Sequence, residues 1–208
     1  CTNINASHKD LENIYNKASK TNGIRNVFVT SGLRYDLFLN EEGFINDGRS
    51  YFETLVKKHI SGRLKVAPEH GIDGVLKIMR KPSYQLFRKL KKEYEKLNKS
   101  LGKKQEIVPY IITGHPGEKI EDCIETATLL KQDSLFPEQI QDFTPTPMTL
   151  SSAMYYLGFN PYNGEHVQIS RDMDEKKLHN SIILWHKKES REYISKILRN
   201  KYLQEKIR

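Results

Sequence analysis

The stretch YIITGHPGEKIED, residues 110–122, decides the fold class of the chain. It continues an apolar run that begins at Ile107, and the run ends in the loop TGHPG, residues 113–117, before an acidic segment. A short apolar run that ends in Gly and Pro is typical of a buried strand, and early acidic residues are typical of a helix N-terminus. The sequence therefore predicts a strand over residues 106–113, an exit loop and a helix over residues 118–131.

The same order of strand, exit loop and helix recurs along the chain. Strands are expected to begin near residues 26, 63, 106 and 139. Helices are expected over residues 7–18, 50–60, 73–80, 83–97, 118–131 and 150–157. Alternation at about 30–45 residues per unit favours right-handed connections between parallel strands. The predicted fold class is α/β, with either a small doubly wound sheet or half of a (β/α) barrel, and both bind ligands at the carboxyl ends of their strands.

Local signals complete the predicted architecture. Ser50 and Glu53 have the spacing of a capping box, which predicts that a helix starts at Ser50. The first strand, residues 26–32, is expected to be short and buried. A Gly/Asn/Pro-rich link then leads to a charged helical tail. We therefore divide the chain into an α/β part, residues 1–157, and a helical C-terminal extension, residues 158–208.

The charge balance of the chain suits anionic partners. The chain carries 34 Lys and Arg against 26 Asp and Glu, which gives a formal net charge of +8 and a pI near 9.3. Such an excess suits contact with nucleic acid or an anionic substrate, and a solvated Lys-rich surface is the simpler explanation. The sequence shows no signal peptide and no run of 18 apolar residues, which predicts a cytoplasmic protein with no membrane partner.

The two cysteines, Cys1 and Cys123, limit the metal chemistry that the sequence suggests. Two thiols build neither a disulfide framework nor, by themselves, a metal site, and no Cys/His zinc spacing is visible. Cys123 lies in the helix predicted after the third strand and is expected to be a small buried apolar side chain. We therefore predict no metal ligands in this chain.

Candidate functional residues lie in the loops that follow the four predicted strands. These loops read SGLRYD, APEHG, TGHPGE and TPTP, and they contain Arg34, Asp36, Glu69, His70, His115 and Glu118. Gly114 and Gly117 permit positive φ, and the helix start beyond them presents free N–H groups that suit a carboxylate, a phosphate or a nucleobase edge. A tight structural turn explains the same glycines. A single loop His can be an acid or base near neutral pH, but it more often makes a structural hydrogen bond.

Taken together, the loops resemble a known family. The segments LKVAPEHGIDGVLKIMRKPSYQLF (64–87), IVPYIITGHPGEKIEDCIETATLLK (107–131) and IQDFTPTPMTLSSAMYY (140–156) are similar to the second half of a radical S-adenosylmethionine (radical SAM) core. The phrases SGLRYDL, LKVAPEH, PYIITGHPG and FTPTPM resemble most closely those of the YgiQ-type radical SAM proteins, an uncharacterised bacterial family. They are more distantly similar to radical SAM methylthiotransferases. The likeness covers residues 1–156 in order, so it is more specific than any single loop.

The resemblance implies an activity that this chain holds only in part. Family members bind a 4Fe-4S cluster on a C-x-x-x-C-x-x-C loop and cleave SAM to a 5′-deoxyadenosyl radical. This chain lacks that loop and cannot bind the cluster, and Cys1 is not expected to be a cluster ligand. The chain also begins with Cys rather than Met. We expect it to be the C-terminal portion of a longer enzyme, inactive alone, with about four strands of a partial TIM-type barrel whose missing N-terminal half holds the cluster.

The resemblance leaves the adenosine and substrate side of the barrel to this chain. The implied cofactor-binding residues are Arg34, Glu69, His70, Ile112, Gly114, His115, Phe143 and Thr144. His115 is interpreted as support for its loop rather than as a catalyst. Glu118 is displaced by one residue from the family's adenine-binding motif, which leaves its role open, and no catalytic residue is predicted.

Two further interpretations accompany the enzyme hypothesis. The chain can instead be a basic RNA- or nucleic-acid-binding module without catalysis, because Lys and Arg are frequent in residues 77–104 and 187–208. An RNA substrate would reconcile the two hypotheses, although the substrate is otherwise unknown. The C-terminal helices, with Trp185 and Tyr193 inward, are expected to cover the open side of the partial barrel.

Overall fold

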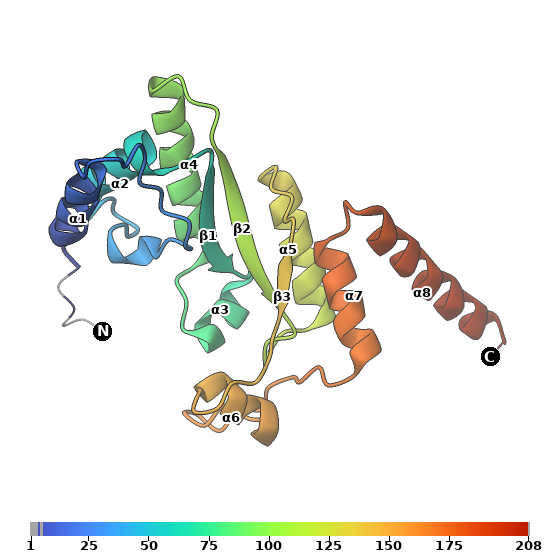
Figure 1. Cartoon of the computed structure of the whole chain (residues 1–208). Coiled ribbons are helices and arrows are strands. Elements are labelled where there is room, and N and C mark those ends of the chain that lie inside the picture. The colour runs from blue at the N-terminus through green and yellow to red at the C-terminus, as the bar shows by residue number, and fades with distance from the viewer. Residues whose placement is uncertain (1–3, 5, 208) are drawn as a thin grey trace. The chain divides into compact units, whose positions relative to one another are not determined.

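The protein folds as a parallel α/β structure, here a computed structural model that describes residues 4 and 6–207 (Figure 1). The strands are β1 (Arg63–Glu69), β2 (Glu106–Thr113) and β3 (Ile140–Asp142), in the sheet order β1-β2-β3. The helices are α1 (Lys9–Ser19), α2 (Gly48–Thr54), α3 (Asp73–Met79), α4 (Tyr84–Ser100), α5 (Ile120–Gln132), α6 (Leu150–Leu157), α7 (Met173–Ile183) and α8 (Lys188–Ile207), with a 3-10 turn η1 (Tyr35–Leu37) and a π-helical turn η2 (Leu55–His59). The predicted α/β class with parallel strands is confirmed. The sheet is not closed into a barrel, so the partial TIM-type barrel stays a prediction.

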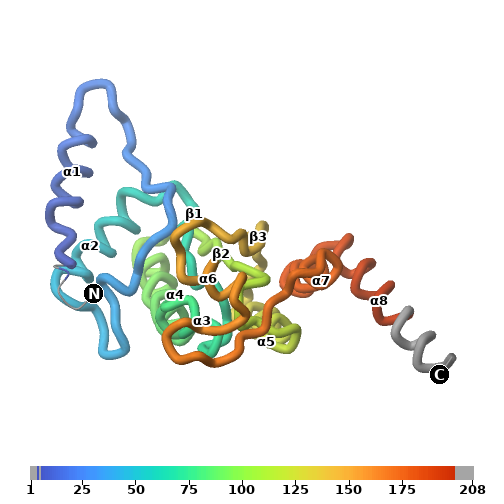
Figure 2. Tube along the Cα trace, turned by 90° about the horizontal axis from the view of Figure 1, so that it is seen from below, coloured from blue at the N-terminus to red at the C-terminus, as the bar shows by residue number. Residues whose placement is uncertain are grey.

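The chain divides into two compact units. Unit 1 comprises Cys1–Ala67 and Gln85–Val108, and unit 2 comprises Pro68–Tyr84 and Pro109–Arg208. Figure 2 follows the chain through both units. The predicted division of the chain after residue 157 stays a prediction. None of the helices in the described residues is long and apolar enough to cross a membrane.

Strand β2 forms where the sequence predicts a strand, at residues 106–113. Successive side chains of a strand point to opposite faces, and the burial of β2 follows this alternation. Ile111 and Thr113 are buried, whereas Tyr110 and Ile112 are only half-buried. The pairing of Ile111 with Ile140 is parallel, as predicted. One face of β2 is therefore covered and the other remains partly open.

The strand predicted at residues 26–32 is absent, so the sheet has three strands rather than four among the described residues. None of the side chains of residues 26–32 is buried. The backbone N–H of Val29 donates to the carbonyl of His59 at 2.9 Å, and Leu33 forms a single parallel bridge with Val66. His59 lies in the π-helical turn η2 and cannot offer the extended backbone that a ladder requires. This part of the predicted architecture was wrong.

The capping box predicted at Ser50 is also absent, because α2 begins earlier, at Gly48. A Cβ at Gly48 would overlap the backbone of Phe38, so Gly48 permits a close approach of the helix start to that segment. The preceding Asp47 does not cap α2. Its Oδ2 accepts hydrogen bonds from the His8 backbone N–H at 2.8 Å and the Ser7 hydroxyl at 3.1 Å, next to the start of α1.

The C-terminal tail is helical, as predicted, and its first helix belongs to the core of unit 2. Helix α7 packs against α5 and the edge strand β3, and Ile183 of α7 is fully buried. The break between α7 and α8 falls at residues 184–187, before the predicted position near residue 189. Trp185 and Tyr193 are half-buried. The position of α7 agrees with a role in covering the edge of the sheet.

Truncation of a single side chain tests this role of α7. Ile183→Ala should lower the free energy of unfolding by about 2–5 kcal/mol, because it removes buried methylenes and leaves a cavity. Leu198→Ala in α8 is the matched control, since Leu198 is 61% exposed and its loss should change stability by less than about 0.5 kcal/mol. Urea unfolding followed by circular dichroism measures both. Equal effects of the two substitutions would refute the role.

Candidate functional site

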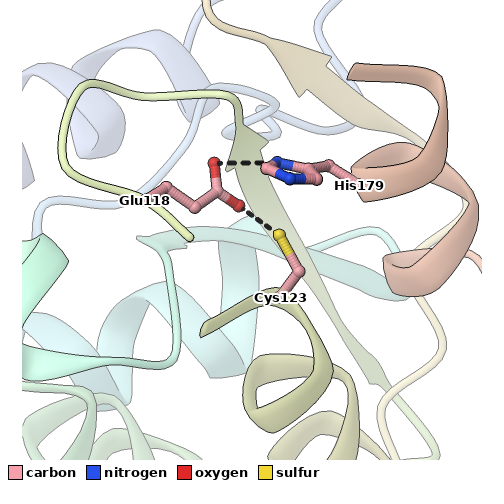
Figure 3. A group of neighbouring side chains, drawn as sticks. All are labelled: Glu118, Cys123 and His179. Atoms are coloured by element: carbon pink, nitrogen blue, oxygen red, sulfur yellow. Dashed lines mark hydrogen bonds and ion pairs between the residues drawn. The ribbon is translucent and has the colours of Figure 1, made fainter. Parts of the chain in front are cut away.

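The loop after β2 folds around the carboxylate of Glu118, which is fully buried. Its Oε2 accepts hydrogen bonds from the backbone N–H groups of Gly114 and His115, the latter at 3.1 Å. Its Oε1 accepts the thiol proton of Cys123 in α5 at 2.6 Å (Figure 3). Glu118 therefore satisfies two loop donors that cannot reach water, and it ties the loop to the helix that follows.

Two buried histidines from other segments of unit 2 flank the same carboxylate. His70, after β1, places Nε2 3.5 Å from Oε1 of Glu118, and its Nδ1 accepts the backbone N–H of Ile72 at 3.0 Å. His179, in α7, places Nδ1 3.9 Å from Oε2 of Glu118, as Figure 3 shows. Among the described residues, neither Nε2 of His70 nor either ring nitrogen of His179 has a hydrogen-bond partner. The carboxylate thus joins the β1 exit loop, the β2 exit loop, α5 and α7.

The electrostatics of this cluster favour an ionised Glu118 beside a protonated thiol. Burial alone would raise the pKa of Glu118, but the contacts with His70, Cys123 and His179 outweigh burial and hold that pKa below its usual range. Burial first, and then the negative charge of Glu118, raises the pKa of the Cys123 thiol. Burial lowers the pKa of His115, which favours the neutral imidazole.

Both glycines of the loop adopt positive φ, and Gly117 also has a close neighbour that leaves no room for a Cβ. Gly114 has φ of +71° and Gly117 has φ of +91°, a region that L side chains rarely adopt. A Cβ at Gly117 would also overlap Cδ1 of Ile78 in α3. The N–H of Gly117 donates to the carbonyl of Gln168 at 2.8 Å. The loop is therefore held from both sides within unit 2.

A pocket lies at the strands β2 and β3 of unit 2, beside the carboxyl end of β1. Its volume is about 190 Å³. It is lined by Glu69, Tyr110, Ile111, Ile112, Gln139, Ile140 and Gln141. Two predicted cofactor-binding residues, Glu69 and Ile112, therefore share one concave surface. The Glu69 carboxylate also accepts a hydrogen bond from Nζ of Lys81 at 2.8 Å, which keeps it paired.

Three further predicted residues lie around the loop and the exit of β3. His115 is buried, and its Nδ1 and Nε2 each lie 2.8 Å from an oxygen, the carbonyl of Pro116 and the hydroxyl of Ser151. The His115 ring contacts Phe143 edge to face at 5.1 Å. Such contacts hold the loop in place, which is the role that the sequence suggests for His115. Thr144 is exposed, and its hydroxyl donates to the carbonyl of Asp142 at 3.4 Å.

Arg34 is the predicted site residue that does not belong to unit 2. It belongs to unit 1, whereas the other seven belong to unit 2. Its guanidinium forms a bidentate pair with Asp36, with distances of 2.8 and 2.7 Å, and its side chain is 65% exposed. The two loop residues that the sequence singles out here, Arg34 and Asp36, therefore bind each other.

One group of buried side chains of metal-ligand type is not predicted from the sequence. Among the described residues, Glu118, Cys123 and His179 form a group whose potential ligand atoms all lie within 4.8 Å of one another. Cys1 lies outside the described residues. The available signal was His179 itself, which lies three and four positions before Ile182 and Ile183, on the register of an apolar helix face. No spacing rule connects such a residue to a Glu and a Cys about 60 positions earlier in the chain.

The chain is similar in sequence to proteins of an uncharacterised family. A family profile described as "Domain of unknown function (DUF3362)" matches residues 138–205, the segment that contains α7. UPF0313 proteins of Methanocella arvoryzae, Bacteroides thetaiotaomicron and Porphyromonas gingivalis are 38%, 42% and 40% identical to the chain, over 95%, 96% and 95% of its length. The chain covers 32%, 33% and 32% of these relatives, so it spans about a third of their length. No solved structure matches the chain.

Removal of the Glu118 charge tests its structural role. Glu118→Gln should lower the free energy of unfolding at pH 7 by about 1.5–3 kcal/mol, the range for hydrogen bonds to a charged group. Because the folded-state pKa of Glu118 is depressed, its contribution is complete above the unfolded pKa of about 4.3 and is lost as the pH falls through the lower folded value. The difference between wild type and variant should therefore shrink below about pH 4.

Thermal or urea unfolding between pH 3 and pH 7, with a chelator present, measures this difference. Glu121→Gln is the matched control, because Glu121 is exposed on the first turn of the same helix. A difference that stays constant with pH, or a control with the same loss, would contradict the assignment.

Proposed function

We propose that this chain supplies the adenosine and substrate side of a YgiQ-type radical SAM enzyme, with the iron-sulfur cluster held outside residues 1–208. The observation that carries the proposal is the pocket on strands β2 and β3 beside the carboxyl end of β1, where Glu69 and Ile112 from two successive motifs meet. Ligands of parallel α/β folds bind at this edge. The relatives are about three times as long as the chain, which leaves room for a cluster-binding part.

The pocket suits one wall of a binding site. Its volume of about 190 Å³ is below the roughly 300–1,000 Å³ of a complete ligand pocket. Half-buried Tyr110 and Ile112 offer apolar surface to a purine ring, and the paired carboxylate of Glu69 offers acceptors to ribose hydroxyls. The partly open face of β2 is also what the inner face of a partial barrel requires, so we include that barrel in the proposal.

The cluster itself does not fit the residues of this chain. A 4Fe-4S cluster with one open iron requires three thiolates, and the chain has two cysteines. Cys123 is fully buried and donates to Glu118. In radical SAM proteins the cluster supplies the electron that cleaves SAM. Here the residues of the chain would bind and orient the adenosine and exclude water from it.

The longer protein that contains this chain tests the proposal. It should encode a C-x-x-x-C-x-x-C loop before Cys1, and after anaerobic reconstitution with iron and sulfide it should convert SAM to 5′-deoxyadenosine, measured by chromatography. Ile112→Trp should weaken SAM binding by about tenfold or more, which equals about 1.4 kcal/mol, because the indole occupies the pocket. The control Ile124→Trp replaces a residue that is 52% exposed in α5. A longer protein without the cysteine loop, or without 5′-deoxyadenosine formation, would refute the enzyme hypothesis.

RNA binding is a second candidate function, and a group of cations and aromatic rings favours it. The guanidinium of Arg80 lies 4.1 Å from the ring of Tyr162, which is 66% exposed. Arg171 and Lys176 lie 5.6 and 5.5 Å from the ring of Tyr155. Tyr162 is exposed and Tyr155 is half-buried, and aromatic rings beside cations suit the stacking of unpaired bases. The net charge of +8 suits phosphates.

Binding of a single-stranded RNA to the full chain, measured by fluorescence anisotropy, tests this second function. The affinity should fall steeply between about 50 and 200 mM salt, because bound phosphates release counterions. Tyr162→Ala should cost about 1–3 kcal/mol of binding free energy, the value of one stacked base. Arg25→Ala, at an exposed position of unit 1, should leave binding within twofold. No measurable binding at about 50 mM salt would exclude this function.

A further inference from the structure

We propose that Glu118, Cys123 and His179 bind a divalent transition metal ion, and that Zn²⁺ is the ion that their donor atoms suit best. The three residues supply one oxygen, one sulfur and one nitrogen from the β2 exit loop, α5 and α7 of unit 2 (Figure 3). Each of the three side chains is fully buried. This site is independent of the proposed enzyme activity, because it uses only residues of this chain and no SAM.

The distances within the group are close to those around a bound ion. The potential ligand atoms all lie within 4.8 Å of one another. Bonds of about 2.0–2.3 Å put two ligands of a tetrahedral ion about 3.3–3.8 Å apart. The widest separation therefore needs to shrink by no more than about 1.5 Å. Sγ of Cys123 and Oε1 of Glu118, which are 2.6 Å apart in a hydrogen bond, need to move apart by about 1 Å once the thiol proton leaves.

His179 gives the independent sign that a ligand is expected here. Its side chain is fully buried, and neither ring nitrogen has a hydrogen-bond partner among the described residues. A buried polar group without a partner is destabilising. Nδ1 of His179 faces the carboxylate of Glu118 at 3.9 Å, too far for a hydrogen bond. An ion between them would give Nδ1 the partner that it otherwise lacks.

The surroundings provide the outer contacts that metal ligands generally have. Nε2 of His179 lies 4.0 Å from a carboxylate oxygen of Glu175, beyond hydrogen-bond distance. A small shift of the Glu175 side chain would make it the carboxylate to which a metal-bound imidazole commonly donates its second N–H. Glu118 is oriented by the N–H groups of Gly114 and His115 and by nearby His70. The carboxylate is therefore held in position before any ion arrives.

The charges also balance when the ion is present. Binding requires that the Cys123 thiol release its proton to water, because the thiolate is the ligand. The thiolate, the Glu118 carboxylate and neutral His179 then carry two negative charges, which a doubly positive ion cancels in the buried site. Mg²⁺ and Ca²⁺ prefer six or more oxygen ligands, whereas Zn²⁺ accepts sulfur, nitrogen and oxygen in a four-coordinate site. The donor set therefore selects Zn²⁺ or Co²⁺ over Mg²⁺ and Ca²⁺.

Titration of the reduced, metal-free 208-residue chain with Co²⁺ tests the proposal. We expect one Co²⁺ per chain, with a sulfur-to-cobalt charge-transfer band in the near ultraviolet and the visible bands of tetrahedral cobalt. Added Zn²⁺ should bleach these bands, because it binds such sites more tightly than Co²⁺. Cys123→Ser should remove the charge-transfer band, whereas Cys1→Ser, which replaces the other cysteine, should keep it.

A second measurement separates metal binding from folding defects. Zn²⁺ should raise the Tm of the wild type and Mg²⁺ should not, because only Zn²⁺ binds the native site. His179→Gln should lose at least about tenfold in Zn²⁺ affinity and most of the Tm increase, whereas His166→Gln, at an exposed position of unit 2, should keep both. Absence of the cobalt bands in the wild type, or their retention in Cys123→Ser, would overturn the proposal. Neither outcome depends on whether the longer protein cleaves SAM.

Discussion

The burial of one ionised carboxylate constrains the whole of unit 2. An isolated carboxylate in an apolar interior would be strongly destabilising, so Glu118 needs hydrogen bonds. It obtains them from the β2 exit loop, through the N–H groups of Gly114 and His115, and from Cys123. His70 adds a contact from the β1 exit loop. The conformation of two exit loops and the packing of α5 therefore follow from the satisfaction of a single side chain.

The sequence predicted those elements whose signals are local. Strand β2 and helix α6 have the predicted bounds, because the residues that signal each element lie within it or next to it: a continuous apolar run that ends in a Gly/Pro loop for β2, and the Gly/Asn/Pro-rich link that follows Leu157 for α6. The strand at residues 26–32 and the cap at Ser50 failed for tertiary reasons. The would-be strand meets a π-helical turn instead of an extended neighbour, and α2 starts at Gly48 because that residue fits against Phe38.

The residues of the candidate site also differ in whether a local sequence signal identifies them. Exit-loop residues such as Glu69 and Ile112 can be found from sequence, because parallel strands bring their carboxyl ends to one edge and the two residues do share a pocket. The pairing of Arg34 with Asp36 is local, between residues two positions apart, whereas the surroundings of His179 depend on which segments meet in space. No local pattern encodes the approach of α7 to Glu118, so the buried group could not be predicted from spacing.

Strand β2 contributes to both proposed sites. Ile112 points to the partly open face and lines the pocket, whereas the next residue, Thr113, is buried on the covered face. The Thr113 hydroxyl lies 2.5 Å from Oδ1 of Asn180, the residue that follows His179 in α7. One strand thus presents a ligand surface on one side and supports the buried group on the other. A change at the buried group can reach the pocket through β2 and its exit loop, and also through β3, because α7 packs against β3 and β3 lines the pocket. Both routes run through the strands that form the wall, so a change at the buried group should affect the stability of the wall.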